Sequence, residues 1–398
     1  MRSPRRPRRG RRSGTLQTGS LRRRLPFRRR CAIKSPMPES AFHQSLDAFR
    51  GECDKTLGRW ITNRRKRAVE SDTEGIELVD TVARLVESGG KRIRPAIVWF
   101  SHLACGGEEE DRAMLLAIAC ELLHTYLLVH DDIMDHAEKR RGESTAHVEF
   151  SELHIHRRWH GDAHDYGRSV GILAGDLAGS WSSEAAHMAL AGLEAERARR
   201  LSALFFGMCE EVIWGQHLEM RVAARRTASA ADLARVLRLK SGCYTVERPL
   251  QLGAMLAGAE DDIFEALSTY GGALGEAFQL RDDLLGMFGD PSAVGKPVGD
   301  DLIEGKLTFI IHHAMQAASP AQRGALQGAL GNRELTAEQA ADACALIEEL
   351  GARAAIQEMI DQRLGIAQAA LDGVATRLAG PGHEILAGLI GYLGHRRN

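Results

Sequence analysis

The stretch that decides the fold is Glu121–Gly142, ELLHTYLLVHDDIMDHAEKRRG. Apolar residues recur before and through it at three-to-four spacing, which predicts one helix with a buried face that runs into an acidic cluster. Asp131 and Asp135 lie four positions apart, so their side chains share a helix face about 6 Å apart along the axis. Arg140 and Arg141 follow just beyond the helix.

Three carboxylates, Asp131, Asp132 and Asp135, therefore crowd the end of an apolar helix. Carboxylates so placed repel one another unless a cation lies between them, and Mg²⁺ is held by one or two carboxylates together with substrate phosphates. The two arginines suit bidentate contacts with the same phosphates. The alternative is an acidic helix end followed by a solvated basic loop, and a second copy of the pattern downstream favours the metal interpretation.

The chain has 398 residues and a formal net charge of −1 that hides a strong asymmetry. Its first 36 residues hold 14 of the 52 basic residues and none of the 53 acidic ones, which leaves the remainder at −15. An acidic body argues against nucleic acid as a partner. The seven cysteines lack CxxC spacing, which predicts free thiols in a reducing cytoplasm. Because Glu121 and His124 interrupt the best apolar run, we expect no membrane span.

Residues 1–36 are rich in Arg, Pro and Ser and cannot fold by burial. Three interpretations remain open: a reading frame whose natural start is Met37, an Arg-rich targeting peptide, or a nucleic-acid-binding arm. We expect residues 37–398 to form a single catalytic domain. Helix formers dominate it and no period-2 alternation is sustained, which predicts a nearly all-helical body.

Among its elements we expect helices over Ser40–Trp60 and Ile76–Glu87, and a polar loop over Glu149–Ser169. Four histidines lie in this loop, but their pattern is more typical of an ordinary surface loop than of a metal site, since no cysteine or paired ligand set accompanies them. They are His154, His156, His160 and His164.

Further motifs add positive charge and a second acidic helix end. Ser88–Pro95, SGGKRIRP, places glycines, which let backbone approach a ligand, beside three cations. Phe278–Asp290, FQLRDDLLGMFGD, repeats the first two aspartates as Asp282 and Asp283, but Gly286 takes the third position. Gly295–Thr308, GKPVGDDLIEGKLT, is a Gly-rich loop suited to covering anions.

Two acidic helix ends and three basic loops, separated by helices, fit an all-α helical bundle with a central cavity and its motifs gathered at one mouth. With these motifs in this order and spacing, the body over residues 40–398 resembles the trans-isoprenyl diphosphate synthases of the polyprenyl synthetase family. The resemblance implies a homodimer that condenses isopentenyl diphosphate with allylic diphosphates of C5 to C15, with three Mg²⁺ ions in each active site.

The resemblance also implies roles for single residues. Asp131, Asp135 and Asp282 match the metal ligands, with Asp132 in support. The isopentenyl diphosphate site is matched by Lys91, Arg94, His124 and Arg141. The allylic diphosphate site is matched by Arg140, Lys240, Lys296 and Lys306. The positions that steady the allylic cation are matched by Ser241, Tyr244 and Gln279, and those that line the pocket by Gln216 and Glu219. Because Gly286 departs from the full second motif, we expect a weakened outer shell around the metal.

The resemblance also implies that Tyr126 sets the length of the product. Tyr126 lies five residues before Asp131, about 7.5 Å further up the helix. Helical geometry alone puts Tyr126 about 140° around from Asp131, so its role as a cavity floor comes from the resemblance. One ring at this position, with Leu127 beside it, resembles the geranylgeranyl (C20) type, and farnesyl (C15) is the alternative.

Two more distant interpretations make different demands on the sequence. A terpene cyclase needs a second metal motif with Asn or Asp, Ser or Thr, and Glu, and none of the three asparagines lies in such a setting. A non-catalytic partner subunit predicts eroded aspartates, whereas the first cluster is whole.

Overall fold

The structure of the protein is a computed structural model, which describes residues 39–71, 74–289 and 299–394. The Arg-rich N-terminal tract and Lys296 lie outside the described residues. The described residues all belong to one compact unit. Its described part is nearly all helix, which confirms the predicted all-α class.

The elements of the first half end at the loop before α8, and two of them are short strands that pair antiparallel. In chain order they are α1 (Glu39–Ser71), α2 (Ile76–Glu87), α3 (Ile93–Ala104), α4 (Glu110–Met134), β1 (Lys139–Arg140), β2 (Glu143–Ser144), α5 (Ala146–Arg157), α6 (Ala163–Leu190) and α7 (Ala195–Arg225).

The second half contains a π-helix, η1, and a short 3₁₀ turn, η2, among its α-helices. In chain order the elements are α8 (Ala230–Val236), η1 (Leu237–Glu247), α9 (Arg248–Ala257), α10 (Asp261–Phe288), α12 (Asp300–Glu304), α13 (Phe309–Ala317), α14 (Pro320–Ala329), α15 (Ala337–Glu349), α16 (Ala352–Gly373), η2 (Ala375–Arg377) and α17 (Gly382–Gly394).

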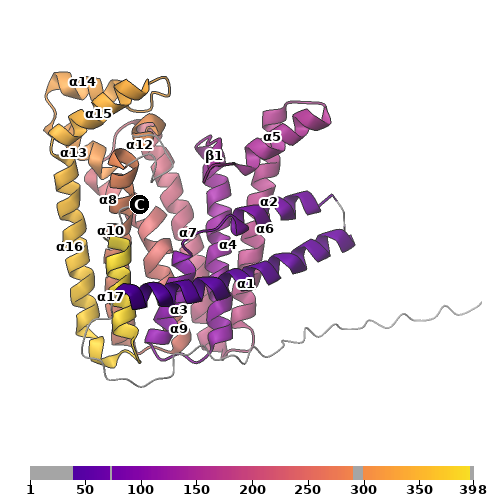
Figure 1. Cartoon of the computed structure of the whole chain (residues 1–398). Helices are drawn as coiled ribbons and strands as arrows, with labels where there is room; N and C mark the ends of the chain where they lie inside the picture. The colour runs from indigo at the N-terminus through magenta and orange to yellow at the C-terminus, as the bar shows by residue number, and fades with distance from the viewer. Residues whose placement is uncertain (1–38, 72–73, 290–298, 395–398) are drawn as a thin grey trace, which may run out of the picture. The chain divides into compact units, whose positions relative to one another are not determined.

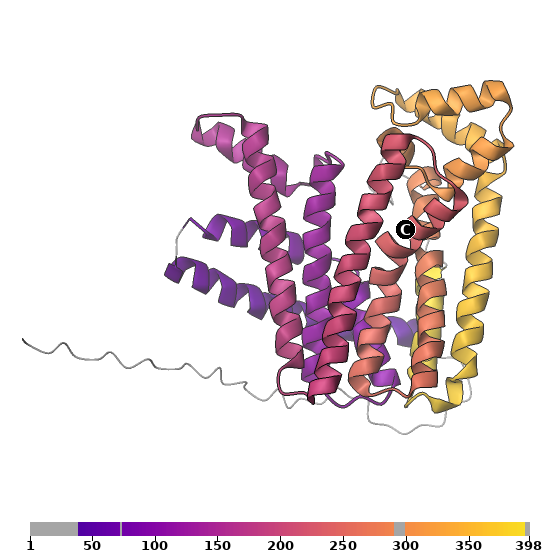
Figure 2. The ribbon, with the colours of Figure 1, turned by 180° about the vertical axis from the view of Figure 1, so that it is seen from behind.

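Helix α4 runs through the core between α6 and α7 (Figures 1 and 2). Its Leu116, Ile118 and Leu122 are fully buried, as the three-to-four spacing of apolar residues predicts. By length and composition α4 would pass as a membrane span, but 61% of its apolar window is buried inside the protein. Its apolar character is therefore that of a core helix.

Helix α1 lies across the upright helices in Figure 1 and is longer than the sequence predicts. It continues eleven residues beyond Trp60 to Ser71. Two ion pairs support this extension, because Arg64 contacts Glu184 of α6 at 2.8 Å and Arg65 contacts Asp80 of α2 at 2.7 Å.

The prediction of a polar loop over Glu149–Ser169 is wrong. Helix α5 continues to Arg157, and α6 begins at Ala163 with Asp162 as its N-cap. His154 is buried, with Nε2 3.1 Å from the carbonyl oxygen of His160 and its ring 5.2 Å from that of Tyr166. One of the four histidines is therefore a core residue of the α5–α6 hairpin.

Two other expected loops also contain regular structure. The basic segment after the first acidic cluster forms the β1–β2 hairpin, in which Arg140 pairs with Glu143. Its turn uses positive φ at Arg141 (54°) and Gly142 (85°), a conformation that two-residue hairpin turns require. The Gly-rich segment near Lys306 contains α12, which is bounded by Gly299 and Gly305, both with positive φ.

Candidate active site

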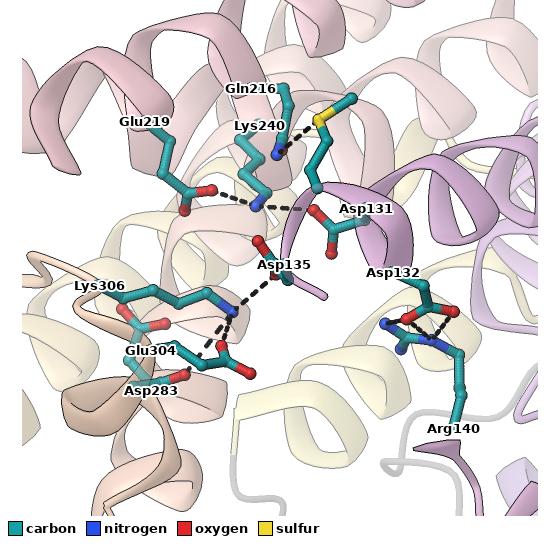
Figure 3. A network of polar contacts seen from close by, with 12 residues as sticks. Asp131, Asp132, Asp135, Arg140, Gln216, Glu219, Lys240, Asp283, Glu304 and Lys306 are labelled. Carbon is teal, nitrogen blue, oxygen red and sulfur yellow. Dashed lines mark hydrogen bonds and ion pairs between the residues drawn. The ribbon is translucent and has the colours of Figure 1, made fainter. Parts of the chain in front are cut away.

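The first acidic motif ends α4, and two of its carboxylates face lysines from other elements (Figure 3). Asp131 Oδ1 lies 3.3 Å from Nζ of Lys240 in η1, and the same ammonium group bonds Glu219 of α7. Asp135 Oδ2 lies 3.4 Å from Nζ of Lys306, which follows α12. The fold therefore brings together two carboxylates and two ammonium groups from distant parts of the chain.

Glycines allow close approach to the backbone that carries Lys240. A Cβ atom at Gly215 of α7 would lie 2.3 Å from the backbone nitrogen of Lys240, and one at Gly275 of α10 would lie 2.5 Å from the carbonyl oxygen of Gly242. No side chain fits at either contact. The wider π-helical winding of η1, which often marks functional sites, is thus held from both sides.

The lysines give the two aspartates different proton affinities. Burial alone would raise the pKa of Asp131, but Lys240 and Lys306 outweigh it and lower that pKa. Burial raises the pKa of Asp135, and repulsion from Asp131 adds to the effect. Asp131 is therefore held ionised, while a second negative charge beside it is disfavoured until more positive charge arrives.

Asp132 points away from the lysines and pairs with Arg140 (Figure 3). Its side chain is 2% exposed and accepts hydrogen bonds from Nε of Arg140 at 2.8 and 2.9 Å, while Nη2 lies 2.6 Å from Oδ1. The pair ties the β1–β2 hairpin to the end of α4. In this arrangement Asp132 positions an arginine and does not face the carboxylates of Asp131 and Asp135.

A cleft on the other side of α4 collects several predicted residues. Its lining includes Ser88, Glu121, His124, Arg140 and Arg141. The guanidinium group of Arg141 also donates to the carbonyl oxygen of Gly89. Burial and the surrounding arginines hold the pKa of His124 well below its ordinary value, so this imidazole is neutral.

Arg94 joins this group to η1. Its Nη2 donates to the hydroxyl oxygen of Tyr244 at 2.7 Å and to that of Thr245 at 2.8 Å, and its guanidinium carbon lies 4.3 Å from the centroid of the Tyr244 ring. The Tyr244 hydroxyl oxygen lies 3.3 Å from Nδ1 of His124. Three residues predicted from separate motifs are therefore in direct contact.

The cations of the SGGKRIRP segment differ in role. Arg92 is buried, adopts a positive φ of 48°, and pairs with Glu121 at 2.5 Å and Asp54 at 2.8 Å. It therefore stabilises the fold, a function that sequence reasoning missed because Arg92 sits beside cations predicted to bind substrate. Lys91 is exposed.

The second acidic motif lies in the last turns of α10. Gln279 donates a hydrogen bond to Asp283 at 2.8 Å. Burial raises the pKa of Asp283 to about 8, and repulsion from Asp301 and from the neighbouring Asp282 adds to the shift. Like the first motif, this cluster has more carboxylate charge than its surroundings neutralise.

The space beside Gly286 is occupied by a carboxylate from α12. A Cβ atom at Gly286 would lie 2.6 Å from Oδ2 of Asp301. Lys306 Nζ lies 4.0 Å from Asp301 and 2.6 Å from Glu304. Lys306 therefore links α12 to the first motif, since it also contacts Asp135. Sequence reasoning assigned a role to the lysine alone, although both acidic residues lie in the same quoted segment.

The remaining predicted residues are more dispersed. Gln216 Nε2 lies 3.7 Å from the sulfur of Met134 at the end of α4 (Figure 3). Ser241 is buried beside Lys240. Tyr126 lies more than one turn back along α4, where its ring meets α6 at Gly179.

The donor set at the motifs fits Mg²⁺ bound together with a diphosphate. Among the described residues no three His, Cys, Asp or Glu side chains form a metal cage by themselves. Mg²⁺ does not need one, because it takes one or two carboxylates and completes its shell with phosphate and water. The carboxylates of Asp131 and Asp135 provide such a pair, with Lys240 and Lys306 beside them to contact the phosphate oxygens.

This arrangement fits a class of protein: all-helical enzymes that use a divalent metal and clustered cations to act on diphosphates. Comparisons with known proteins agree. The chain is 32% identical over 289 residues to geranylgeranyl diphosphate synthase of Saccharolobus solfataricus, covering 73% of this chain and 81% of that protein. It is 36% identical over 236 residues to geranylfarnesyl diphosphate synthase of Aeropyrum pernix, covering 59% and 69%.

Among solved structures, the chain is similar to geranylgeranyl pyrophosphate synthase from Corynebacterium glutamicum complexed with isoprenyl diphosphate and magnesium. The TM-score is 0.83 at 34% identity, covering 88% of this chain and 99% of that one. The family model for polyprenyl synthetase matches residues 77–347. The chain belongs to the polyprenyl synthetase family and is a short-chain prenyltransferase.

Proposed function

We propose that this prenyltransferase joins isopentenyl diphosphate to allylic diphosphates of C5 to C15, with geranylgeranyl diphosphate (C20) as its main product. The observation that supports this most is that lysines from two later segments meet the first acidic motif, where Lys240 pairs with Asp131 and Lys306 pairs with Asp135. We assign the activity to a single catalytic domain, residues 37–398.

We propose that Asp131, Asp135 and Asp282 hold three Mg²⁺ ions over the allylic diphosphate. When bound, Mg²⁺ stabilises the negative charge that develops on the departing diphosphate. Burial alone would lower the pKa values of Lys240 and Lys306, but the attraction of acidic neighbours is larger and raises them, so both lysines stay protonated. In the proposal, both ammonium groups contact oxygens of the departing diphosphate. Arg140, held by Asp132, adds a guanidinium group, and Lys296 is the further candidate from the sequence.

The isopentenyl diphosphate site is formed in this proposal by Lys91, Arg94, His124 and Arg141. His124 is neutral, so its imidazole donates a hydrogen bond without adding charge. The bonds of Arg94 to Tyr244 and Thr245 fix its guanidinium group before substrate arrives. Such pre-organisation lowers the entropy cost of holding the second substrate in line with the first.

The reaction begins when the allylic carbon–oxygen bond breaks, leaving an allylic cation and diphosphate. The double bond of isopentenyl diphosphate attacks the cation, and a proton then passes to the departed diphosphate. Each cycle adds five carbons. Tyr244, Ser241 and Gln279 steady the cation in the proposal, and burial of Ser241 helps to exclude the water that would capture it.

The proposal is tested by incubating the full-length protein with labelled isopentenyl diphosphate, Mg²⁺ and each of the C5, C10 and C15 primers. The products are hydrolysed and the alcohols sized. Label in a C20 alcohol from every primer is expected, and its loss in Asp131→Asn is the control. A C15 end product supports the farnesyl alternative. Cyclised hydrocarbon indicates a terpene cyclase, and activity only with a second protein indicates a partner subunit.

We further propose that Tyr126 is the floor that stops elongation at C20. In the structure its half-buried ring lies between α4 and α6, deeper than the motif in the direction of the helix N-terminus. Tyr126→Ala is expected to lengthen the product. An unchanged product on a chromatogram removes Tyr126 from this role.

A homodimer is proposed from the outer faces of α6 and α7 (Figure 2). Large exposed apolar side chains gather there, and a second copy of the chain would cover them. They are Ile172, Leu173, Met188, Phe206, Ile213, Trp214 and Met220. Trp214→Glu is expected to give monomers in light scattering, whereas Ile366→Glu, at an exposed position on α16, leaves the dimer intact. A dimeric Trp214→Glu variant contradicts this interface.

We propose a cytoplasmic location. The cysteines of the described residues are free thiols, and burial raises the pKa of several, including Cys105 and Cys209 to about 12 in each case. Such thiols suit a reducing compartment. Fractionation of cells that produce the protein checks this, and recovery in an oxidising compartment contradicts it.

A further inference from the structure

Three glycines of α6, spaced four residues apart, receive three side chains of α4. At each glycine an added Cβ atom would meet a side chain of α4 at 3.3 Å or less. The contacts are Gly171 with Ile133 (3.0 Å), Gly175 with His130 (2.4 Å) and Gly179 with Tyr126 (3.3 Å). Residues four apart share a helix face, so the glycines form one row along α6.

His130 is the middle side chain of this row. Its Nε2 lies 3.1 Å from the carbonyl oxygen of Ile172 and 3.7 Å from the carboxylate of Asp176. Its ring packs edge-on against Tyr126, with the centroids 4.7 Å apart. Since Gly175 has no side chain, the His130 ring occupies the space over Gly175 and lies beside the Tyr126 ring.

We propose that His130 is a positioning residue that sets product length by fixing the ring of Tyr126. The inference rests on the proposed role of Tyr126 as the cavity floor. Gly179 lies on one side of the Tyr126 ring and the His130 ring lies on another. The Tyr126 ring therefore cannot move toward α6 or toward His130. Without the His130 ring, the space over Gly175 becomes available and Tyr126 turns into it, which deepens the cavity. A methyl group at Gly179 pushes the ring away from α6 and makes the cavity shallower.

Simple packing between helices predicts something different. If the row only joined α4 to α6, substitutions along it would change stability and turnover without changing the ratio of product lengths. The product ratio at matched turnover therefore separates positioning from packing.

The experiment uses two substitutions that divide the properties of His130. His130→Phe keeps a ring over Gly175 but loses the hydrogen bond to Ile172. His130→Asn keeps an amide donor but loses the ring. We expect His130→Phe to give the wild-type C20 product and His130→Asn to raise the share of products longer than C20 several-fold. Gly179→Ala is expected to shift the product toward C15.

Gly171→Ala is the matched control, because it perturbs the same row through Ile133 without touching either ring. Its product ratio is expected to equal that of the wild type. Equal lengthening in Gly171→Ala and His130→Asn overturns the proposal in favour of general loosening. If Tyr126→Ala lengthens the product but His130→Asn does not, the positioning role of His130 is refuted and the role of Tyr126 as the cavity floor is retained. If Tyr126→Ala leaves the product at C20, the floor fails, and the positioning role fails with it.

Discussion

Replacing Arg140 with methionine tests the ion pair that fixes the hairpin beside the first acidic motif. Methionine keeps much of the side-chain length but removes the hydrogen bonds and the ion pair that Arg140 makes with Asp132, whose side chain is 2% exposed. Removing one member of a buried ion pair costs about 3–5 kcal/mol. Because the Arg140 side chain is 29% exposed and Asp132 has a further interaction, we expect a loss at the lower end of this range, about 3 kcal/mol of unfolding free energy.

Urea unfolding followed by circular dichroism in the presence of a chelator measures this loss. Asp132→Leu combined with Arg140→Met is expected to recover most of it, because both charges of the pair are then removed. Arg140→Lys should fall between, since it keeps the charge without the bidentate geometry. Prenyl transfer should stay low in both variants that carry methionine at position 140. An Arg140→Met variant within about 0.5 kcal/mol of the wild type, or a double variant no more stable than the single one, refutes the reasoning.

Three further predictions follow from other contacts. Lys240→Ala is expected to lower kcat by about 10²–10³-fold because a cation beside the departing diphosphate is lost; steady-state rates at saturating substrate check this, and an unchanged kcat contradicts it. Thr245→Val removes a 2.8 Å bond to Arg94 and should raise the KM for isopentenyl diphosphate more than it lowers kcat, whereas an effect on kcat alone would argue against a binding role. In the presence of a chelator, the pKa of Asp283 is about 8 in the folded protein and about 3.9 in the unfolded chain. The unfolding free energy should therefore fall as pH rises between these two pKa values, by at most about 1.4 kcal/mol per pH unit. Asp283→Asn should flatten this slope, and a variant with the wild-type slope would contradict the prediction.

The sequence predicted the parts of the fold that depend on local pattern. The helix that ends at Asp131–Asp135 and the one that ends within Phe278–Asp290 were confirmed, because apolar spacing and the position of the acidic residues are both local signals. The histidine-rich segment was misjudged, since its polar composition concealed the face on which Phe150 and His154 are buried.

Contacts between distant segments lay beyond local patterns. Nothing in the spacing of DDIMD distinguishes Asp132, which turns toward Arg140, from its neighbours that face lysines. The packing of Asp301 beside Gly286 likewise depends on how α12 meets α10. Tertiary contacts of this kind decide which charged residue of a motif stabilises the fold and which faces the site.

The most direct test of the account is a crystal structure with Mg²⁺ and a non-cleavable thio analogue of an allylic diphosphate. We predict that metal ions connect the diphosphate to Asp131 and Asp135, that its oxygens contact Lys240 and Lys306, and that the isoprenoid tail points toward Tyr126. A diphosphate bound away from these lysines, or a tail that leaves the bundle in another direction, would contradict the account.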